Sequence, residues 1–309
     1  MTNNKWCGGN ELKFAVIDIG SNTAKAEIYR YKNKKLILLE KYVERDMIAD
    51  HKDLGTLDDD GVSILINIMN KFRRICERSG VKMIFPYATQ SLRGIDNADD
   101  VCGRIKDATG LLVTIISGED EARLCCEAFL SLSGENDGYL TDMGGGSTEI
   151  NLIDNGKILR SVSLPFGSRS ICREFGVDIV PDPEQERLIC EAVDRRIEAA
   201  GFTQSGKDMF ACGGTVSGMF KLYRAITGNS VECAEVRELS DFYATLKNDR
   251  DSAEETARIH TPDRYDTIYA GMLAHLRLCT ALGCKVIHHA KTTCRRGYAQ
   301  QLINNGIIK

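Results

Sequence analysis

The first apolar run of the chain leads into a pattern typical of consecutive β-strands. Residues 14–40 read FAVIDIGSNTAKAEIYRYKNKKLILLE. The apolar run ends at Asp18, a turn follows at Gly20 and Ser21, and polar and apolar residues then alternate, as in a strand with one buried face. A polar turn and a further strand complete the segment. The pattern therefore predicts a three-stranded unit with a glycine turn after its first strand.

A second stretch repeats this order. Residues 139–164 contain an apolar run that ends at Asp142, three glycines at 144–146, Ser147, and an alternating strand. An Asn-Gly pair at 155–156 then gives a hairpin turn signal. Either copy alone could be a plain hairpin of a mixed sheet, but the aspartate, glycine and serine that both copies share favour two related domains.

The rest of the chain alternates helical and extended patterns. Apolar periodicity and capping residues predict strands at 82–89 and 110–117 and helices at 56–80 with Thr56 as its N-cap, around 101–108, at 119–131 with Ser117 as its N-cap, and at 183–200, 215–226, 236–248, 265–281 and 291–305. Strands that alternate with helices predict the α/β fold class. In a chain of 309 residues we expect two domains, 1–130 and 131–290, with the last helix, about 291–309, packed back on the first domain.

The two glycine turns are the positions that point to chemistry. Glycine is selected where the backbone needs a positive φ or where a ligand approaches it closely. Successive backbone N–H groups in such a turn form a concavity that binds anions. A P-loop opens a helix, whereas both turns here join two strands. This pattern favours one phosphate-binding loop in each domain.

Six motifs together resemble one known family. They are DIGSNT (18–23), ATQSLR (88–93), ISGEDEARL (116–124), DMGGGSTEI (142–150), SLPFG (163–167) and ACGGT (211–215). In this order, and over nearly the whole chain, they resemble the exopolyphosphatase and guanosine pentaphosphate phosphohydrolase family, Ppx/GppA, of the actin-like ATPase superfamily. The resemblance implies two actin-like (ribonuclease H-like) α/β domains with an active-site cleft between them. It also implies release of terminal phosphate from polyphosphate or guanosine pentaphosphate with Mg²⁺ or Mn²⁺.

The resemblance assigns roles residue by residue. Glu121 matches the family's proposed catalytic base, and Glu149 matches its second essential carboxylate. Asp142 matches a metal-associated aspartate, with Glu149 and Asp18 as further candidate ligands. The residues expected at the phosphates are Gly20, Ser21, Asn22, Arg93, Gly144, Gly145, Gly146, Ser147, Gly213, Gly214 and Thr215.

Two segments depart from the family's pattern. The family usually carries an arginine three residues past the glycine of LPFG, where this chain has Ser170 and places Arg169 one position earlier. The family's REG reads Arg-Arg-Gly at 295–297, with Arg296 in place of glutamate. The C-terminal extension of larger members is also absent, so we expect a minimal two-domain form that prefers short polyphosphate or small nucleotide substrates.

Several of these residues also have a purely structural interpretation. Glu119 and Asp120 are expected in the first turn of a helix, where carboxylates stabilise the helix dipole, and Glu121 could have that role alone. Arg93 could cap or pair with a loop, and CGGT at 212–215 could simply be a turn into a helix.

The main alternative function is an actin-like ATP-binding kinase or a nucleotide-sensing regulator. A kinase needs an acceptor site, usually with an aspartate base. The carboxylates of Glu121 and Glu149 suit an activated water better. Sequence does not separate polyphosphate from guanosine pentaphosphate, and it leaves a homodimer open.

Composition restricts the class of protein further. With 43% hydrophobic and 27% charged residues the chain has the composition of a soluble globular protein, and no apolar stretch reaches the length of a membrane span. A net charge of −4 argues against a general nucleic-acid binder. Together with the polar N-terminus, these features lead us to expect a cytoplasmic protein with no nucleic-acid or membrane partner.

The twelve cysteines show no C-x-x-C pair, so a zinc knuckle or a thioredoxin-like motif is not predicted. Free cysteine packs as a small apolar residue, which is the favoured interpretation here. The vicinal pair at 125–126 and a loose group of Cys284, His288, His289 and Cys294 are the alternatives for metal binding or redox sensing.

Overall fold

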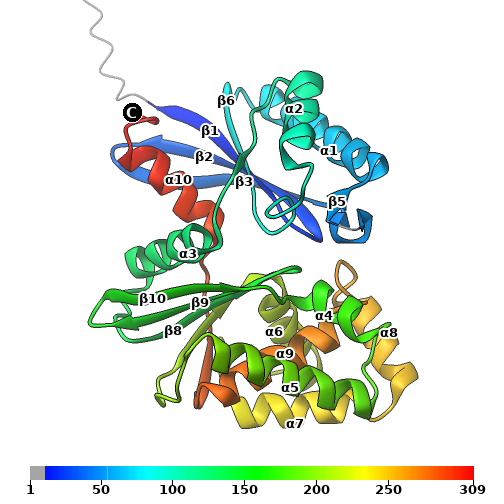
Figure 1. Ribbon diagram of the computed structural model, residues 1–309. Helices are drawn as coiled ribbons and strands as arrows, with labels where there is room; N and C mark the ends of the chain where they lie inside the picture. The colour runs from blue at the N-terminus through cyan, green and yellow to red at the C-terminus, as the bar shows by residue number, and fades with distance from the viewer. Residues whose placement is uncertain (1–10, 54) are drawn as a thin grey trace, which may run out of the picture. The chain divides into compact units, whose positions relative to one another are not determined.

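The computed structural model describes residues 11–53 and 55–309, which divide into two compact units. Unit 1 ends at Ile116 and resumes at Arg295, and unit 2 spans Ser117–Cys294 (Figure 1). The sequence predicted the boundary at residues 130–131, which lie near the end of helix α3 (Gly118–Ser133). The boundary lies before α3 because this helix packs on strands of unit 2. The final helix, from Arg295 on, is grouped with unit 1.

Unit 1 is built on a five-stranded sheet with the strand order β3-β2-β1-β6-β7. Its elements are β1 (Leu12–Ile19), β2 (Thr23–Lys32), β3 (Lys35–Arg45), a 3-10 turn η1 (Ile48–His51), β4 (Lys52–Asp53), β5 (Thr56–Leu57), α1 (Asp59–Arg78), β6 (Met83–Ala88), α2 (Ala98–Thr109), β7 (Thr114–Ile115) and α10 (Cys294–Asn304). Strands β1, β2 and β3 form the predicted antiparallel meander, and β6 and β7 continue the sheet parallel to β1.

Alternation along β1 assigns its two faces. Ile17 and Ile19 belong to the hydrophobic cluster that α1 and α2 cover. Asp18 points to the opposite face, where it contacts Arg295 of α10. Figure 1 shows α10 on one face of this sheet and α1 with α2 on the other. The fold of unit 1 therefore buries polar residues of the sheet beneath its last helix.

Unit 2 is built on a six-stranded sheet with the strand order β10-β9-β8-β11-β13-β12. Besides α3 its elements are β8 (Gly138–Met143), β9 (Thr148–Asp154), β10 (Lys157–Leu164), α4 (Ser168–Phe175), α5 (Pro183–Ala199), β11 (Met209–Cys212), α6 (Gly213–Thr227), β12 (Cys233–Glu235), α7 (Val236–Lys247), α8 (Arg250–His260), α9 (Ile268–Ala281) and β13 (Val286–His289). The opening meander β8-β9-β10 repeats that of unit 1, as the sequence predicted.

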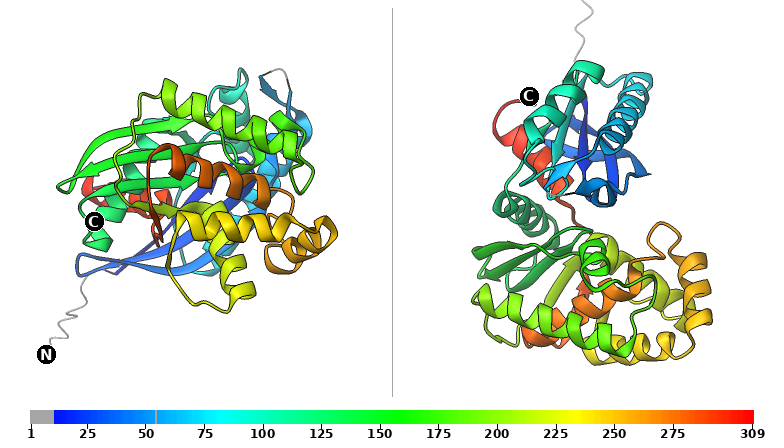
Figure 2. Two further views of the ribbon diagram at one scale, coloured as in Figure 1. Left: turned by 90° about the horizontal axis from the view of Figure 1, so that it is seen from below. Right: turned by 45° about the vertical axis from the view of Figure 1, so that its right-hand side comes forward.

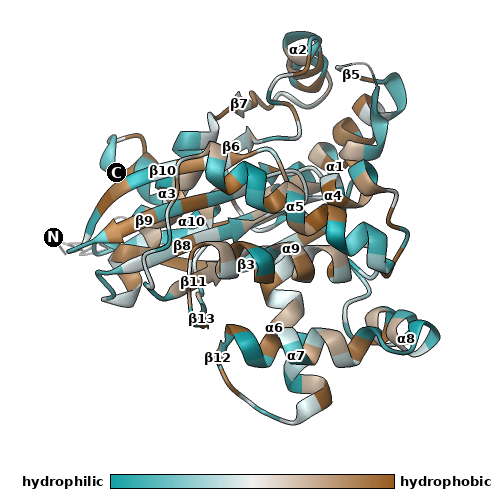
Figure 3. Ribbon diagram, turned by 60° about the horizontal axis from the view of Figure 1, so that its bottom comes forward, coloured by the Kyte–Doolittle hydropathy of each residue, from teal (hydrophilic) through white to brown (hydrophobic). Residues whose placement is uncertain are grey.

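Helices cover both faces of the unit 2 sheet. Helix α3 lies on one face, and α4, α5, α6, α7 and α9 lie on the other, as Figures 1 and 2 show. Helix α9 is buried along nearly its whole length and is mostly hydrophobic, whereas α5 carries a polar outer side (Figure 3). Tyr139, Met143 and Ile150 point toward the α9 side, so Asp142 and Glu149 face α3.

Several element predictions need correction. Asp58, not Thr56, caps α1, because its carboxylate accepts a hydrogen bond from the Gly61 amide at 2.7 Å. The strand expected at 110–117 is only the two-residue β7, and Leu112 before it is 67% exposed. Helices α4 and α8 were not predicted. In the described residues no helix is long and apolar enough to cross a membrane.

Candidate active site

In unit 1 the first glycine turn and the ATQSLR segment lie at one edge of the sheet. Strands β1 and β6 are parallel, with Ile19 opposite Ala88, so the loops that follow them emerge side by side. The Thr89 amide donates to the Ile19 carbonyl at 3.4 Å, and the Ser91 hydroxyl donates to the same oxygen. Two motifs far apart in sequence thus form one loop cluster, as expected for a ligand site at the carboxyl ends of parallel strands.

The turn at residues 20–22 is held by its carbonyl groups. The Ser21 carbonyl accepts from the Ala49 amide at 3.0 Å, and the Asn22 carbonyl accepts from the amides of Asp46 and Met47. Ser21 and Asn22 are buried. A Cβ atom on Gly20 would lie 2.9 Å from the Thr23 carbonyl oxygen, which explains the glycine. The turn is a fixed structure, and its contact with phosphate stays a prediction.

Arg93 lies in the same loop cluster, in a fixed orientation. Its guanidinium donates to the Gln90 side chain at 3.0 and 3.2 Å and to the Ile116 carbonyl at 3.2 Å. The arginine is therefore positioned by its neighbours before any ligand arrives, which suits a phosphate contact.

Asp18 fits its predicted role as a metal ligand poorly. Its carboxylate pairs with Arg295 at 2.7 Å, and Arg295 also pairs with Glu27 at 2.9 Å. Burial alone would raise the pKa of Glu27, but the Arg295 charge and the hydrogen bond from Tyr29 bring that pKa below its ordinary value. Asp18 thus belongs to a buried ionic network that sequence reasoning did not foresee.

Asp46 is another acidic residue of unit 1, and the sequence predicted no role for it. Its exposed fraction is 2%. Its Oδ1 accepts a hydrogen bond from the Ile48 amide at 3.5 Å, and its Oδ2 has no hydrogen-bond partner among the described residues. Burial, with a smaller contribution from the charge of Asp18, raises the pKa of Asp46 to about 8. This carboxyl group is therefore protonated at neutral pH.

In unit 2 the second glycine turn is anchored to the start of α4. The Gly144 carbonyl accepts from the Ser168 amide at 3.0 Å, and the Gly145 carbonyl accepts from the amides of Arg169 and Ser170 at 2.9 and 3.0 Å. The amides of Gly145 and Gly146 donate to no group in the described part of the chain. With its carbonyls directed at a helix, this loop keeps N–H groups for an anion.

Asp142 and Glu149 lie beside this loop and face the same way. They are opposite each other in the register of β8 and β9, so their side chains share one face of the sheet. Glu149 is buried, and its Oε1 accepts from the Ser163 hydroxyl at 2.7 Å. The two carboxylates predicted for metal and catalysis are thus brought together.

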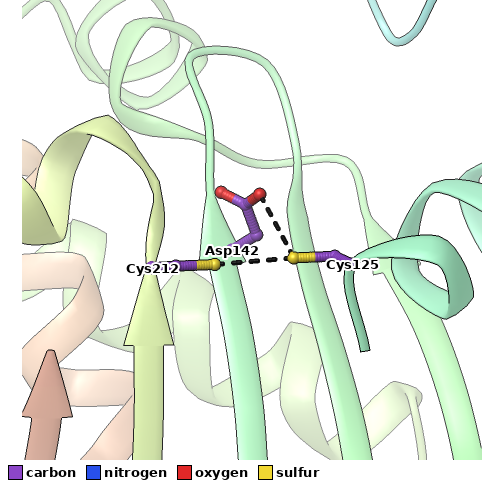
Figure 4. Close-up of side chains that lie close together, drawn as sticks. All are labelled: Cys125, Asp142 and Cys212. Atoms are coloured by element: carbon purple, nitrogen blue, oxygen red, sulfur yellow. Dashed lines mark hydrogen bonds between the residues drawn. The ribbon is translucent and has the colours of Figure 1, made fainter. Parts of the chain in front are cut away.

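Two cysteines complete this face. Cys125 of α3 donates to Asp142 Oδ2 at 3.8 Å and lies 3.6 Å from Cys212 Sγ at the end of β11 (Figure 4). The hydrogen bond with Cys212, burial and the nearby carboxylates raise the pKa of Cys125 well above its ordinary value. The contact with Cys125 lowers the pKa of Cys212, but burial, Asp142 and Glu149 outweigh it and raise that pKa to about 11.

Glu121 is placed by the same contact. It lies four residues before Cys125 in α3, so the two side chains emerge on one face of the helix, about 6 Å apart along its axis. Since Cys125 touches Asp142, the face of α3 that carries Glu121 is the face that packs toward the Asp142 and Glu149 pair. Ser117 caps this helix through the Asp120 amide, as predicted.

The ACGGT segment contributes mainly to packing. Gly213 begins α6 with a φ of 91°, and a Cβ there would lie 2.4 Å from Asp142 Oδ1. A Cβ on Gly214 would lie 2.2 Å from Arg264. Thr215 is buried against Gly271 of α9. Gly213 therefore adjoins the carboxylate site, whereas the Thr215 side chain packs into the core.

The departures from the family pattern have local explanations. Arg169 pairs with Asp266 at 3.0 Å, and the Ser170 hydroxyl accepts from the Gly167 amide at 2.8 Å at the start of α4. Both side chains thus support the position of α4.

The loose histidine and cysteine group is dispersed in the structure. His288 pairs with Asp208, and His289 pairs with Glu232. Among the described residues, the set that could hold a metal ion is Cys125, Asp142 and Cys212. The sequence pairs Cys125 with its neighbour Cys126 as a candidate, whereas the structural partners of Cys125 are Asp142 and Cys212.

The oxygen donors beside the second glycine loop match what Mg²⁺ requires. Mg²⁺ prefers oxygen ligands and is usually held by one or two carboxylates, with waters and substrate phosphates completing the shell. Asp142 and Glu149 supply such carboxylates beside a loop with available amides. This pair fits the ion, whereas Asp18 does not, because Arg295 already neutralises it.

Comparisons with known proteins identify the family of the chain. Residues 28–305 match the Ppx/GppA phosphatase family. The chain is 27% identical over 234 residues to exopolyphosphatase 1 of Mycobacterium leprae, an alignment that covers 73% of this chain and 68% of that protein. For the exopolyphosphatase 1 of Mycobacterium tuberculosis H37Rv the share covered is 57% of its length.

Two solved structures show the fold. The Aquifex aeolicus member of the Ppx/GppA family superposes with a TM-score of 0.79 at 20% identity, covering 97% of this chain and 100% of that one. An exopolyphosphatase from Cytophaga hutchinsonii superposes with a TM-score of 0.84 at 17% identity, covering 95% and 98%.

The chain therefore belongs to the Ppx/GppA phosphatase family and has its two-domain actin-like fold, as the sequence predicted. Its class is that of the phosphoanhydride hydrolases.

Proposed function

We propose that this protein releases terminal phosphate from polyphosphate or guanosine pentaphosphate, with an activated water as nucleophile and Mg²⁺ or Mn²⁺ as cofactor. Family membership supports the reaction class, and relatives named exopolyphosphatases support polyphosphate as a substrate. The observation that carries the mechanism is the contact of Cys125 with Asp142, because it sets the Glu121 face of α3 beside the Asp142 and Glu149 carboxylates.

In this proposal three groups of residues have separate roles in the hydrolysis. Glu121 accepts a proton from the attacking water, the amides of the loop at 144–147 bind non-bridging phosphate oxygens, and Asp142 with Glu149 holds the divalent cation. The cation, when bound, neutralises charge on the phosphoryl oxygens. Water forms the new bond to phosphorus while the bond to the bridging oxygen breaks, so inorganic phosphate and a shortened chain leave. Phosphoryl transfer needs positioning and charge stabilisation more than covalent chemistry, and these residues supply both.

Two finer points belong to the same proposal. With Ser170 and Arg296 in place of the family's residues, we propose a preference for short polyphosphate or small nucleotides. We also propose a cytoplasmic location, because the eleven cysteines that the structure describes are free thiols, as a reducing compartment favours.

The test is phosphate release from polyphosphates of several defined lengths, guanosine pentaphosphate and ATP, each measured with and without Mg²⁺. We expect metal-dependent release without any acceptor, and faster turnover at equal concentration of chain ends for the shorter chains. ATP consumption that depends on an added small-molecule acceptor would favour a kinase instead. Tight nucleotide binding without release would favour a regulator.

A further inference from the structure

Three elements of unit 2 bring two thiols and a carboxylate to one point. Cys125 comes from α3, Asp142 from β8 and Cys212 from the end of β11, and Figure 4 shows their side chains converging. Their ligand atoms all lie within 4.8 Å of one another. Both cysteines are 1% exposed, whereas Asp142 is partly exposed, so the carboxylate forms the open side of the cluster.

The spacing matches a soft-metal site. A tetrahedral Zn²⁺ with Zn–S bonds of about 2.3 Å holds two sulfurs about 3.8 Å apart, and a sulfur and a carboxylate oxygen about 3.6 Å apart. In the structure the two sulfurs are separated by 3.6 Å, and Cys125 Sγ and Asp142 Oδ2 by 3.8 Å. Both distances from Cys125 Sγ are thus close to those of a bound zinc ion, and the remaining pair, Cys212 and Asp142, lies within 4.8 Å.

The chemistry of the donors separates this site from the magnesium site. Thiolates are soft ligands that select zinc-class ions and do not suit Mg²⁺, which takes oxygen ligands. Glu149 lies across from Asp142 on the same face, so its negative charge also favours a cation there. Cys279, an equally buried thiol in α9, contacts His275 and, among the described residues, no carboxylate, so it serves as an example of a cysteine that only packs.

We propose that Cys125, Cys212 and Asp142 form a binding site for a thiophilic divalent cation of the zinc class. Each thiol loses its proton to solvent on binding, so two protons leave and the three ligands carry three negative charges against the two of the cation. Three protein ligands leave the fourth tetrahedral position to water or to a substrate oxygen.

The site shares Asp142 with the proposed magnesium site, so zinc and Mg²⁺ compete for that carboxylate. Bound zinc should therefore inhibit phosphate release. The binding proposal itself does not depend on the zinc concentration at which this inhibition appears. This competition rests on the proposed function, whereas the binding of the soft cation does not.

Binding is tested directly with Co²⁺, which replaces zinc and gives a thiolate-to-cobalt charge-transfer absorption. The full-length reduced protein is titrated with Co²⁺ under anaerobic conditions, and Zn²⁺ is then added to displace it. We expect one equivalent to give the thiolate band and zinc to remove it. Absence of the band in wild type overturns the proposal.

Variants locate the site. Cys125→Ala and Cys212→Ala each remove a ligand and should weaken Co²⁺ binding by more than about 100-fold, beyond the 10–100-fold that loss of an outer partner costs. Cys126→Ala, the buried neighbour in α3, and Cys233→Ala, an exposed thiol, are matched controls that should retain the band. If an alanine variant has a much lower melting temperature than wild type, Asp142→Asn provides another ligand test. This substitution keeps the size of the side chain. A band that survives in both ligand-cysteine variants would contradict the assignment.

Inhibition is measured separately, as the effect of zinc on each variant's own uninhibited rate of phosphate release. We expect zinc to inhibit wild type and Cys126→Ala at least ten times more strongly than Cys125→Ala, with relief by excess Mg²⁺. A cobalt band without zinc inhibition would disprove the shared ligand. A cobalt band in a protein that releases phosphate from no substrate would leave the metal site standing and overturn the proposed function.

Discussion

Gly167, the residue before α4, lies directly against Gly144 in the glycine loop. A Cβ atom on Gly167 would come within 2.6 Å of the Gly144 carbonyl oxygen and within 2.6 Å of the Gly145 carbonyl carbon. Both contacts are with backbone, so a side chain at 167 could fit only if the loop moved. The glycine of SLPFG therefore allows the loop of DMGGGSTEI to pack against the start of α4. The two motifs are separate in sequence but form one packed unit in the structure.

Gly167→Ala should displace the loop and weaken substrate binding. We expect KM for polyphosphate to rise about tenfold or more and the free energy of unfolding to fall by about 1–3 kcal/mol, the usual cost of overpacking. Gly103→Ala in α2 is the control, because nothing lies within 4 Å of a Cβ there. It should leave KM unchanged and, as a glycine-to-alanine change inside a helix, raise the free energy of unfolding by up to about 1 kcal/mol instead of lowering it. Equal kinetics for the two variants would show that the close approach has no effect on binding.

Arg295 should be essential to the stability of unit 1. It is 6% exposed and pairs with both Asp18 and Glu27, so Arg295→Met leaves the buried Glu27 and the partly buried Asp18 without their cation. We expect the free energy of unfolding to fall by about 3–5 kcal/mol. Chemical unfolding followed by circular dichroism measures the loss.

A double variant separates charge from packing at this site. Adding Glu27→Gln to Arg295→Met removes one of the uncompensated charges and should recover part of the lost stability. The cost of Glu27→Gln alone, in the wild-type protein, is the reference. If Glu27→Gln lowers the free energy of unfolding of Arg295→Met by that same amount, the two residues are not coupled and the ionic account of this network is wrong.

Asp46 should make folding less favourable as pH rises. Its pKa is about 8 in the folded protein against an ordinary value of 3.8, so between these values the folded state binds more protons than the unfolded state. Stability therefore falls with increasing pH across that window, by at most about 1.4 kcal/mol per pH unit, and becomes level above it. Asp46→Asn lacks this titration.

The difference in unfolding free energy between Asp46→Asn and wild type isolates the contribution of Asp46. Measured by chemical unfolding at one-unit steps of pH, it should grow in favour of the variant from the acid end of the window to pH about 8. A difference that stays constant across the window would show that Asp46 ionises in the folded state as it does in the unfolded one.

Local sequence signals predicted much of the fold. The alternation at 148–153 and at 23–32 predicted the two meanders. Ser117 was predictable as a helix cap because its hydroxyl bonds the Asp120 amide only three residues on, so the signal is local. The strand at 110–117 was overestimated, since an apolar run alone does not distinguish a paired strand from a loop that packs.

The candidate site was predictable only in part. Asp142 and Glu149 follow from their positions around one turn, which fixes the register of β8 and β9. The approach of Cys125 to Cys212 was not predictable, because it depends on β8 and β11 being parallel neighbours and on α3 crossing that sheet. The pairing of Asp18 with Arg295 likewise joins the two ends of the chain, and no local pattern contains that information.

Metal dependence should follow Asp142. Asp142→Asn keeps the shape of the side chain but removes a negative oxygen ligand, so half-maximal activity should need at least about ten times more Mg²⁺. Asp154→Asn, at the far end of β9, is the control and should show the wild-type Mg²⁺ requirement. An Asp142→Asn enzyme with an unchanged Mg²⁺ requirement would remove this residue from the metal site.

The central claim is that Glu121 activates the water, and steady-state kinetics of Glu121→Gln test it most directly. The substitution keeps size and hydrogen bonding and removes the proton acceptor, so kcat for phosphate release should fall by about 10²–10⁴-fold, the usual contribution of positioned acid–base catalysis, with little change in substrate affinity. Glu119→Gln, two residues earlier in the same first turn, should cost at most about 1 kcal/mol of stability and leave kcat nearly unchanged. A Glu121→Gln enzyme that turns over within a few-fold of wild type would contradict the account.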